Sequence, residues 1–525
     1  MNKDLAQLDK LFKLNKFEEV ISRTKKLIKK KDFIPPYYNL LGISLDNIGK
    51  SYKAEKIFFE AIKKNSKEIS FYSNLGKILI KQDKLDEAES ILNSAIKIKP
   101  DDPFSLFEYG KLKRLKKKLP EALEYFKNVY KINPSFPNVL FLIGKTYLEL
   151  SQETNDIKLK ELSIENLSRC SELFPENVDA DFLLSEVFNY EKEKKHQHSM
   201  LKKIENLSFR NRRQKSVLLF SIAKSFDDQK KFDQASEFLK MANSEMDSTL
   251  EKNIISKYSQ RFENLKLLFN QIINVKYLED KSLYKKKIIC IIGMPRSGTT
   301  LLHQLIASSR ETEGVGESSV IPSFFETKIF NKEFLNKIYE KNKLNKKYLI
   351  EISGLLGENF NKIQITKKNV IVDKNPSNFF WVGFIKLLFP NSKIIHIKRN
   401  LKDVGLSVYK NIFGVDEMNW SYNPKNIIEY VKIYKNTINF WKQKYGNSIY
   451  EIDYEKLINN KNEETKKLFS FCGLDWSEDI FDFYKTAKTI RTASLYQVKK
   501  PIYKSSVNIS DKYSKYINFL DKFDS

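Results

Sequence analysis

Glycine recurs at a fixed step of 34 residues in the first part of the chain, at Gly42, Gly76, Gly110 and Gly144. Alanine and proline follow the same step, at Ala54, Ala88, Ala122, Pro100 and Pro134. A fixed period of this length indicates one small structural unit used several times. Because such a unit cannot bury its apolar face alone, successive units must stack against each other. The N-terminal part is therefore predicted to be a repeat array.

Within one unit the pattern is glycine, alanine twelve residues later, an apolar residue four after that, and proline near the end. This pattern resembles the tetratricopeptide repeat (TPR), which implies a helix–turn–helix whose small residues let helices pack closely. The fourth unit carries about seven extra residues around 152–158, and Cys170 then takes the place of Ala61 or Ala95. Weaker units keep small residues at the equivalent positions, namely Ser185, Ala223, Ala235 and Ala242.

Residues 1–250 are accordingly predicted to form a TPR α-solenoid, and residues 251–285 a helical connector. The expected role of the array is binding. A peptide, a protein partner and a second copy of the chain (a homodimer) all remain open as occupants of its concave face.

A second sequence feature that constrains the fold is an expected strand followed by a glycine-rich turn. The apolar run Ile288–Ile292 is typical of a buried parallel strand. From Gly293 to Thr300 the spacing is G-x-x-x-x-G-x-T, and a helix is expected to start there. Backbone N–H groups and the helix dipole point into such a turn, which suits an anion. Thr299 stands where nucleoside triphosphatases have the lysine that holds the outer phosphates, while Arg296 supplies a planar, bidentate cation.

The sequence PRSGTT without that lysine resembles the 5′-phosphosulfate loop of sulfotransferases. The resemblance implies transfer of a sulfuryl group from 3′-phosphoadenosine 5′-phosphosulfate (PAPS), with PAP as product and no metal. On the loop alone, a P-loop kinase relative remains open. The residues that the resemblance assigns to donor binding here are Pro295, Arg296, Ser297, Gly298, Thr299 and Thr300.

Two charged residues after the loop are candidates for the chemistry. Glu317 lies in GVGESS, and Lys374 lies in DKNP after a second expected strand, 369–372. The first motif resembles the glutamate motif of tyrosylprotein sulfotransferases, which implies that Glu317 is the general base for the acceptor hydroxyl. The second resembles the family's strand-end lysine, which implies that Lys374 faces the bridging oxygen of the phosphosulfate. Residues 321–368 between them are expected to be helical.

A third expected strand, 393–398, ends at Arg399, and Ser407 follows eight residues later. The sequence RNLKDVGLS resembles the family's 3′-phosphate site, with Leu401 in place of the usual proline. An arginine fork and a hydroxyl there would bind the 3′-phosphate that distinguishes PAPS from ATP. Asp403 is expected to cap the following helix.

Three further residues are assigned to the site from weaker parts of the same resemblance. A fourth expected strand, 448–452, leads to Tyr454, which implies a contact with the nucleotide. The C-terminal segment resembles the part that closes over PAPS, which implies that Ser494 contacts the phosphosulfate. Lys512 is assigned to the 3′-phosphate, although Tyr513 replaces the usual tryptophan and the spacing is longer.

Composition narrows the possible partners and the possible cellular location of the protein. The formal charge is +26, but lysines are spread along all 525 residues without a nucleic-acid-binding motif, so no nucleic-acid partner is expected. Three cysteines in no paired spacing fit a reducing compartment. No apolar run is long enough to span a bilayer, and no signal-peptide core is found, so a cytoplasmic protein is expected. His196 and His198 lack a third metal ligand and are expected on a solvated helix end.

The predicted fold class is therefore α+α/β, with a TPR solenoid followed by a P-loop-type sulfotransferase domain, residues 286–525, built on a mostly parallel sheet. The predicted function is transfer of a sulfuryl group from PAPS to the hydroxyl of a protein tyrosine, a glycan or a small molecule. The expected catalytic residues are Glu317, Arg296, Lys374 and Ser494. Two alternatives remain: a TPR scaffold with an inactive nucleotide-binding domain, and a P-loop kinase.

Overall fold

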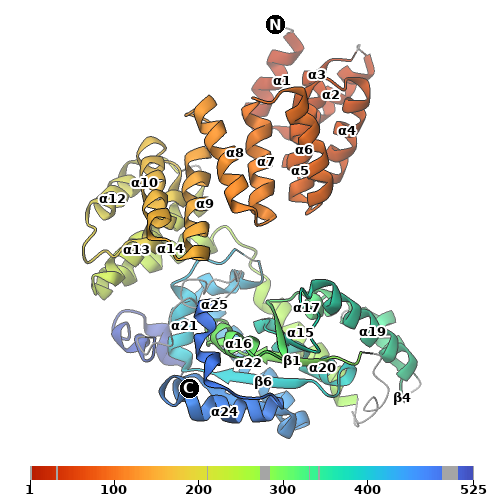
Figure 1. The fold of residues 1–525 in the computed structure, drawn as a ribbon, viewed down its shortest axis with the longest axis vertical. Helices are drawn as coiled ribbons and strands as arrows, with labels where there is room; N and C mark the ends of the chain where they lie inside the picture. The colour runs from red at the N-terminus through yellow and green to blue at the C-terminus, as the bar shows by residue number, and fades with distance from the viewer. Residues whose placement is uncertain are drawn as a thin grey trace. The chain divides into compact units, whose positions relative to one another are not determined.

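The computed structural model describes residues 3–30, 33–209, 211–271, 284–329, 331–340, 343–414, 416–486 and 506–523. The chain divides into two compact units, Met1–Phe188 and Asn189–Ser525 (Figure 1). The first unit is helical, and the second contains helices and a parallel sheet. None of the helices in these residues is both long and apolar enough to cross a membrane.

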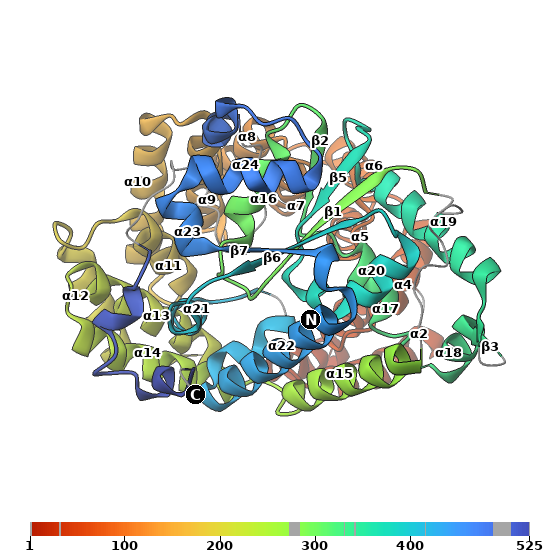
Figure 2. The ribbon, with the colours of Figure 1, turned by 90° about the horizontal axis from the view of Figure 1, so that it is seen from below.

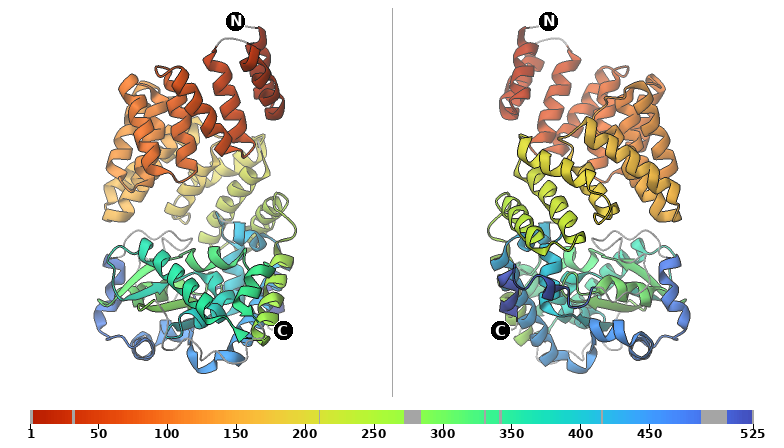
Figure 3. Two further views of the ribbon diagram at one scale, coloured as in Figure 1. Left: turned by 90° about the vertical axis from the view of Figure 1, so that its right-hand side faces the viewer. Right: turned by 90° about the vertical axis from the view of Figure 1, so that its left-hand side faces the viewer.

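The first unit consists of helices that pack in consecutive pairs (Figure 3). Their bounds are α1 Lys3–Lys13, α2 Phe17–Lys30, α3 Pro35–Asn47, α4 Ser51–Lys64, α5 Ile69–Lys81, α6 Leu85–Ile98, α7 Pro103–Leu115, α8 Leu119–Ile132, α9 Val139–Thr154, α10 Ile157–Leu173 and α11 Val178–Val187. The predicted helix–turn–helix repeat is confirmed here.

The repeated glycine is explained by the contact between the two helices of a pair. A Cβ atom at Gly42 would lie 2.4 Å from the ring of Phe58, sixteen residues later on the second helix. Such an approach leaves no room for a side chain. In the fourth unit Gly144 faces Leu167, twenty-three residues later, with a Cβ position 2.7 Å from that side chain. The extra residues of this unit thus lengthen its two helices, and the same contact is kept.

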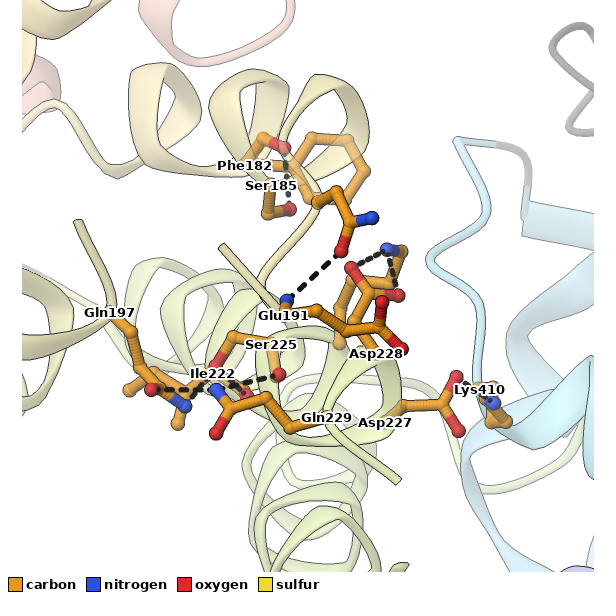
Figure 4. A network of polar contacts seen from close by, with 12 residues as sticks. Phe182, Ser185, Glu191, Gln197, Ile222, Ser225, Asp227, Asp228, Gln229 and Lys410 are labelled. Carbon is orange, nitrogen blue, oxygen red and sulfur yellow. Dashed lines mark hydrogen bonds and ion pairs between the residues drawn. The ribbon is translucent and has the colours of Figure 1, made fainter. Parts of the chain in front are cut away.

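The second unit begins with helices α12 Lys195–Asn206, α13 Arg212–Asp228, α14 Phe232–Asp247 and α15 Ile254–Gln271. Figure 4 shows polar contacts of α13, where Asp227 forms an ion pair with Lys410 at 2.7 Å. Asn243 of α14 also donates a hydrogen bond to the Tyr409 carbonyl oxygen, at 3.0 Å. These helices therefore pack on the α/β part. The predicted limits of the array, 1–250, and of the connector, 251–285, stay predictions.

The sheet of the second unit has five strands in the order β2-β5-β1-β6-β7, and every neighbouring pair is parallel. The bounds are β1 Lys287–Ile292, β2 Thr312–Gly316, β5 Val370–Asp373, β6 Lys393–Lys398 and β7 Ile449–Asp453. The predicted parallel α/β architecture is confirmed. The edge strand β2 was not expected, because the sequence TEGVG contains one large apolar residue and two glycines. Its backbone pairs only with β5 among the described strands.

Helices cover both faces of this sheet (Figure 2). One face carries α16 Thr299–Ala307, α23 Tyr454–Asn459 and α24 Lys461–Cys472, and the other carries α20 Val382–Leu388 and α22 Pro424–Tyr445. Apolar side chains of α16, α23 and α24 form one core cluster with those of β1, β6 and β7. This double cover accounts for the continuous apolar character of the central strands.

Residues 321–368 contain the helices α17 Val320–Phe325, α18 Lys332–Ile338 and α19 Lys346–Ile363, as expected, together with a small hairpin of β3 Tyr339–Glu340 and β4 Lys343–Leu344. The chain ends in two short 3₁₀ helices, η5 Ile509–Lys512 and η6 Asn518–Phe523. His196 differs from its expectation. Its ring is buried, and its Nδ1 atom lies 2.6 Å from the Tyr190 hydroxyl, so this histidine packs inside the helical layer.

Candidate active site

The candidate site lies at the carboxyl ends of the central strands. After β1 the chain moves outward to β2 and returns through β5 beside β1, and it then places β6 on the other side of β1. Loops that leave neighbouring strands in opposite directions open a crevice, which is where open α/β sheets bind ligands. The loops after β1, β2, β5 and β6 all meet there.

The loop between β1 and α16 is held tightly against its surroundings. Arg296 has a φ of 70° and Gly298 a φ of 100°, both in the left-handed region. A Cβ atom at Gly298 would lie 2.5 Å from the ring of Tyr454, and one at Gly293 would lie 2.8 Å from the Ile397 carbonyl oxygen. Gly298 is also the N-cap of α16 and offers no side chain to its first N–H groups. These N–H groups are therefore available to an anion.

Two arginines and a serine converge on this loop. The Nε atom of Arg296 donates to the Ser407 hydroxyl at 3.0 Å, although 111 residues separate them. Arg399 donates to the Arg296 carbonyl oxygen at 2.8 Å, and its guanidinium lies 4.8 Å from the centre of the Tyr454 ring. Its side chain is 8% exposed. Arg296, Arg399, Ser407 and Tyr454 thus lie together, next to Pro295, Ser297, Gly298, Thr299 and Thr300 of the loop.

Asp403 differs from its expected role as a helix cap. The N-cap of α21 (Leu401–Tyr409) is Asn400, whose side chain accepts hydrogen bonds from the first N–H groups of that helix. Asp403 is fully buried and accepts the backbone N–H groups of Asn508 and Ser510, each at 2.8 Å. A carboxylate oxygen of Asp403 also lies 3.7 Å from Arg399. Asp403 therefore ties the C-terminal segment to the site.

The same segment reaches two further site residues. The Ser506 carbonyl oxygen accepts a hydrogen bond from Arg399, and the Ser506 hydroxyl lies 2.7 Å from the Tyr454 hydroxyl. Lys512 lies in η5 with its side chain exposed. Ser494 lies outside the described residues. Asp403 and Ser506 were missed as site residues because their hydrogen bonds join residues more than 50 positions apart, which no local sequence pattern indicates.

On the other side of the loop Lys374 contacts Glu317. The Lys374 ammonium forms an ion pair with the Glu317 carboxylate and donates to the Thr300 hydroxyl at 3.2 Å. Lys374 is fully buried, whereas the Glu317 side chain is 40% exposed. Burial lowers the pKa of Lys374, an effect that Glu317 opposes and Arg296 reinforces. A carboxylate that faces solvent is thus paired with a buried cation that also contacts the phosphate loop.

His303 packs against the turn that carries Glu317. It lies on α16 and is buried, and burial together with the charge of Lys374 lowers its pKa to about 3. Its Nε2 atom lies 3.3 Å from the Gly316 backbone nitrogen, and a Cβ atom at Gly314 would lie 2.7 Å from its ring. A neutral histidine therefore fills the space beneath the turn that carries Glu317, which explains the glycine at position 314.

A cavity of about 240 Å³ lies on the α22 side of β6, lined in part by Met294, Ser297 and Arg399. His396 and Glu451 also line it, with the His396 Nδ1 atom 2.9 Å from the Glu451 carboxylate. Hydrogen bonds from His396 and from Lys442 hold the pKa of Glu451 at about 2, against the effect of burial. This pair links β6 and β7 beneath the candidate site.

Comparison with known proteins identifies both parts of the chain. Residues 289–478 match the model of the sulfotransferase family, and residues 69–102 match a tetratricopeptide repeat model. An uncharacterized protein of Aquifex aeolicus is 31% identical over 257 residues, which cover 46% of this chain and 33% of that protein. A Caenorhabditis briggsae protein described as a "putative protein-tyrosine sulfotransferase" is 22% identical over 205 residues, covering 38% of this chain and 70% of its own. The chain spans about a third of the length of the first of these relatives.

Among solved structures, the TPR protein YrrB matches 36% of this chain and 91% of its own, with 16% identity and a TM-score of 0.28. The TPR protein TTC0263 of Thermus thermophilus matches 35% of this chain and 96% of its own, with 14% identity and a TM-score of 0.31. On the two family models, residues 69–102 are similar to a tetratricopeptide repeat and residues 289–478 are similar to the sulfotransferase family.

Proposed function

We propose that the C-terminal domain transfers a sulfuryl group from PAPS to an acceptor hydroxyl. The observation that carries this proposal is the convergence of Arg296, Arg399 and Ser407 on a phosphate loop that has Thr299 instead of lysine. One end of the loop offers helix N–H groups to one anion, and the arginine–serine cluster offers donors to a second. A ligand with two separated anionic groups fits this arrangement better than a linear triphosphate.

Buried polar atoms at the site also suit such a donor. The Arg399 Nε and the Ser297 hydroxyl are buried and have no hydrogen-bond partner within the described residues. Unpaired buried donors cost free energy, and a ligand's phosphate oxygens would satisfy them. The absent side chains at Gly293 and Gly298 let the loop pack closely against Ile397 and Tyr454. PAPS would supply the activated sulfuryl group, bonded to its 5′-phosphate.

The residues around Lys374 supply the remaining chemistry. Glu317 accepts the proton of the acceptor hydroxyl, whose oxygen forms the new bond to sulfur. The bond from sulfur to the phosphate oxygen breaks, and Lys374, Arg296 and the loop N–H groups stabilise the negative charge that remains on the phosphate. Because Lys374 and Glu317 form an ion pair, the proposed base and the proposed cation are already in contact.

The acceptor class is proposed to be a hydroxyl of a protein, with tyrosine as the first candidate and a glycan or small molecule as alternatives. The helical repeats support a protein partner, because stacked repeats present extended binding surfaces. A scaffold with an inactive domain remains the second candidate function, and it predicts donor binding without turnover.

The repeats also suggest the charge of that partner. Lys77, Lys111 and Lys145, here called the lysine row, occupy the same repeat position on α5, α7 and α9, at a step of 34 residues. Burial, together with the nearby charge of Arg114, lowers the pKa of Lys145. Lys111 is paired with Glu108 at 2.8 Å, Lys145 lies near Glu149 and Asp179, and Lys77 lies near Asp46, so acidic neighbours partly offset the charge of the row. We expect this face to bind an acidic segment.

The proposed function is tested by incubating the purified full chain with PAPS and measuring PAP formation with and without tyrosine peptides, glycans and small phenols. Acceptor-dependent PAP formation that falls in Glu317→Gln supports the proposal. Donor binding without turnover on any acceptor supports the scaffold, and turnover of ATP with Mg²⁺ supports a kinase.

A further inference from the structure

Asn375 contacts two neighbouring segments of the candidate site, and the proposed transfer gives it no role. It follows strand β5 and is the N-cap of the 3₁₀ helix η1, Pro376–Trp381. Its Oδ1 atom accepts the Ser377 backbone N–H at 3.0 Å and the Ser377 hydroxyl at 2.8 Å. Its Nδ2 atom donates to the Ser318 carbonyl oxygen at 2.9 Å. The oxygen end of the amide thus caps η1, and the nitrogen end holds the turn that carries Glu317.

The bond to Ser318 stands where the ladder between β2 and β5 would otherwise continue. The Lys374 backbone N–H donates to the Gly316 carbonyl oxygen at 2.8 Å, just beyond the last paired residues of the two strands. In a parallel pair the backbone donors of one strand are two residues apart, so the next bond would join residue 376 to the Ser318 carbonyl oxygen. Residue 376 is proline, which has no N–H group. The side chain of Asn375 supplies the donor that the backbone lacks.

The turn between β2 and α17 needs such a bond to have a defined position. Gly316 has a φ of 70°, and the pairing of β2 with β5 shifts register just before it. The Glu317 side chain is 40% exposed, so packing alone does not fix it. On the other side of the turn, the Ser318 hydroxyl accepts the Val320 backbone N–H at 3.1 Å. With the carbonyl groups on both sides of it held, Glu317 forms its ion pair with Lys374 from a fixed backbone position.

We propose that Asn375 is a positioning residue for Glu317, which it holds in place by fixing the neighbouring Ser318 carbonyl group. This inference rests on the proposed function for the role of Glu317 as the base. A base must lie within hydrogen-bond reach of the hydroxyl that it deprotonates, and a displacement of about 1 Å can lower a rate by about 10²-fold. Asn375 acts through the backbone of the turn, so it should influence turnover and leave donor affinity unchanged.

The two ends of the Asn375 amide can be separated by substitution. Asn375→Ser keeps a capping oxygen for η1 but is too short to donate to the Ser318 carbonyl oxygen. Asn423→Ser is the matched control, because Asn423 also precedes a proline and caps a helix, α22, by accepting the Lys425 N–H at 3.0 Å. The Nδ2 atom of Asn423 donates to Asp247 of α14 at 3.1 Å. Both variants therefore lose one hydrogen bond besides the cap, whereas only Asn375→Ser should release the turn.

The first measurement is hydrogen–deuterium exchange of the full chain, which needs no turnover. In Asn375→Ser we expect the amides of residues 316–320 and of Lys374 to exchange about three- to tenfold faster, because a hydrogen bond that closes the turn is lost. The amides of β1 and β6 should not change, and residues 316–320 should not change in Asn423→Ser. Unchanged exchange of the turn in Asn375→Ser, or faster exchange confined to η1, would overturn the proposal. If Asn375→Ser does not fold, Asn375→Asp should show the same local change, because its carboxylate keeps the cap but cannot donate.

The second measurement is PAP formation from PAPS in a double-mutant cycle with Glu317→Gln, using the fastest acceptor among tyrosine peptides, glycans and small phenols. Asn375→Ser should lower kcat about tenfold with PAP affinity kept within a few-fold, whereas Asn423→Ser should retain both. In the Glu317→Gln background, Asn375→Ser should lower kcat no further, because a positioning residue has no effect without the group that it positions. An equal loss in both backgrounds would contradict the proposal. Absence of PAP formation in the wild type would contradict the proposed function instead, and the exchange measurement would then decide whether Asn375 holds the turn.

Discussion

Gly298→Ala should weaken donor binding. The phosphate loop needs a backbone conformation at this position that alanine adopts only with strain. The residue has a φ of 100°, and a Cβ atom there would lie 2.5 Å from the Tyr454 ring. The left-handed conformation costs a non-glycine residue about 1–2 kcal/mol. If the loop relaxes to avoid this strain, binding must restore it, which corresponds to a loss of affinity of roughly 5- to 30-fold. Displacement of Tyr454, whose ring lies against Arg399, should increase the loss.

The assay is calorimetric titration of the wild type and the variant with PAP. Gly49→Ala is the matched control, since Gly49 has a φ of 75° but no atom within 4 Å of its Cβ position. The control should carry a similar backbone strain and lower the thermal stability of the first unit without changing PAP affinity. Wild-type affinity in Gly298→Ala would refute the reasoning, because it would mean that the observed loop conformation is not the one that binds the donor.

Three further predictions follow from the same contacts. Glu317→Gln should lower turnover by 10²–10⁴-fold with PAP affinity kept within a few-fold, as measured by PAP formation and calorimetry, and equal turnover would exclude Glu317 as the base. The pKa of Glu451 is depressed to about 2, so its contribution to stability is present above about pH 4.5 and is lost as pH falls toward 2. The difference in melting temperature between wild type and Glu451→Gln should accordingly shrink over that range, and a difference that stays constant would contradict the assignment. Reversal of the whole lysine row to glutamate should abolish binding of a fluorescent peptide of eight glutamates, measured by anisotropy, whereas reversal of three exposed lysines at an equal step on α4, α6 and α8 should not. These control positions are Lys63, Lys97 and Lys131.

The central strands were predictable because burial on both faces leaves apolar runs that local sequence reveals. The expected strands 288–292, 369–372 and 393–398 differ from the observed central strands by at most one residue at each end, and the expected strand 448–452 matches the edge strand β7 equally well. The edge strand β2 was not predictable in this way. Its glycines serve the approach of His303 and the turn before Glu317, and its strand character comes from pairing with β5.

The site residues were predictable by type and motif, but their mutual contacts were not. The motifs around Arg296 and Ser407 were assigned to different parts of the donor, yet the two side chains form a hydrogen bond at 3.0 Å. Asp403 was expected to cap a helix and instead binds the backbone of the C-terminal segment. Local spacing identifies a carboxylate near a helix start, but it does not show which of two neighbouring polar residues, Asn400 or Asp403, takes the cap. That choice depends on a segment about 100 residues away.

The most direct test of the account is calorimetric titration of the full chain with PAP, with ATP and Mg²⁺ as comparator, repeated on Arg399→Ala. Arg310→Ala, a change at an exposed arginine, serves as control. We expect PAP to bind more tightly than ATP with Mg²⁺, Arg399→Ala to lose at least about tenfold in PAP affinity, and the control to keep the wild-type affinity. Equal or tighter binding of ATP with Mg²⁺, or no binding of PAP, would contradict this expectation.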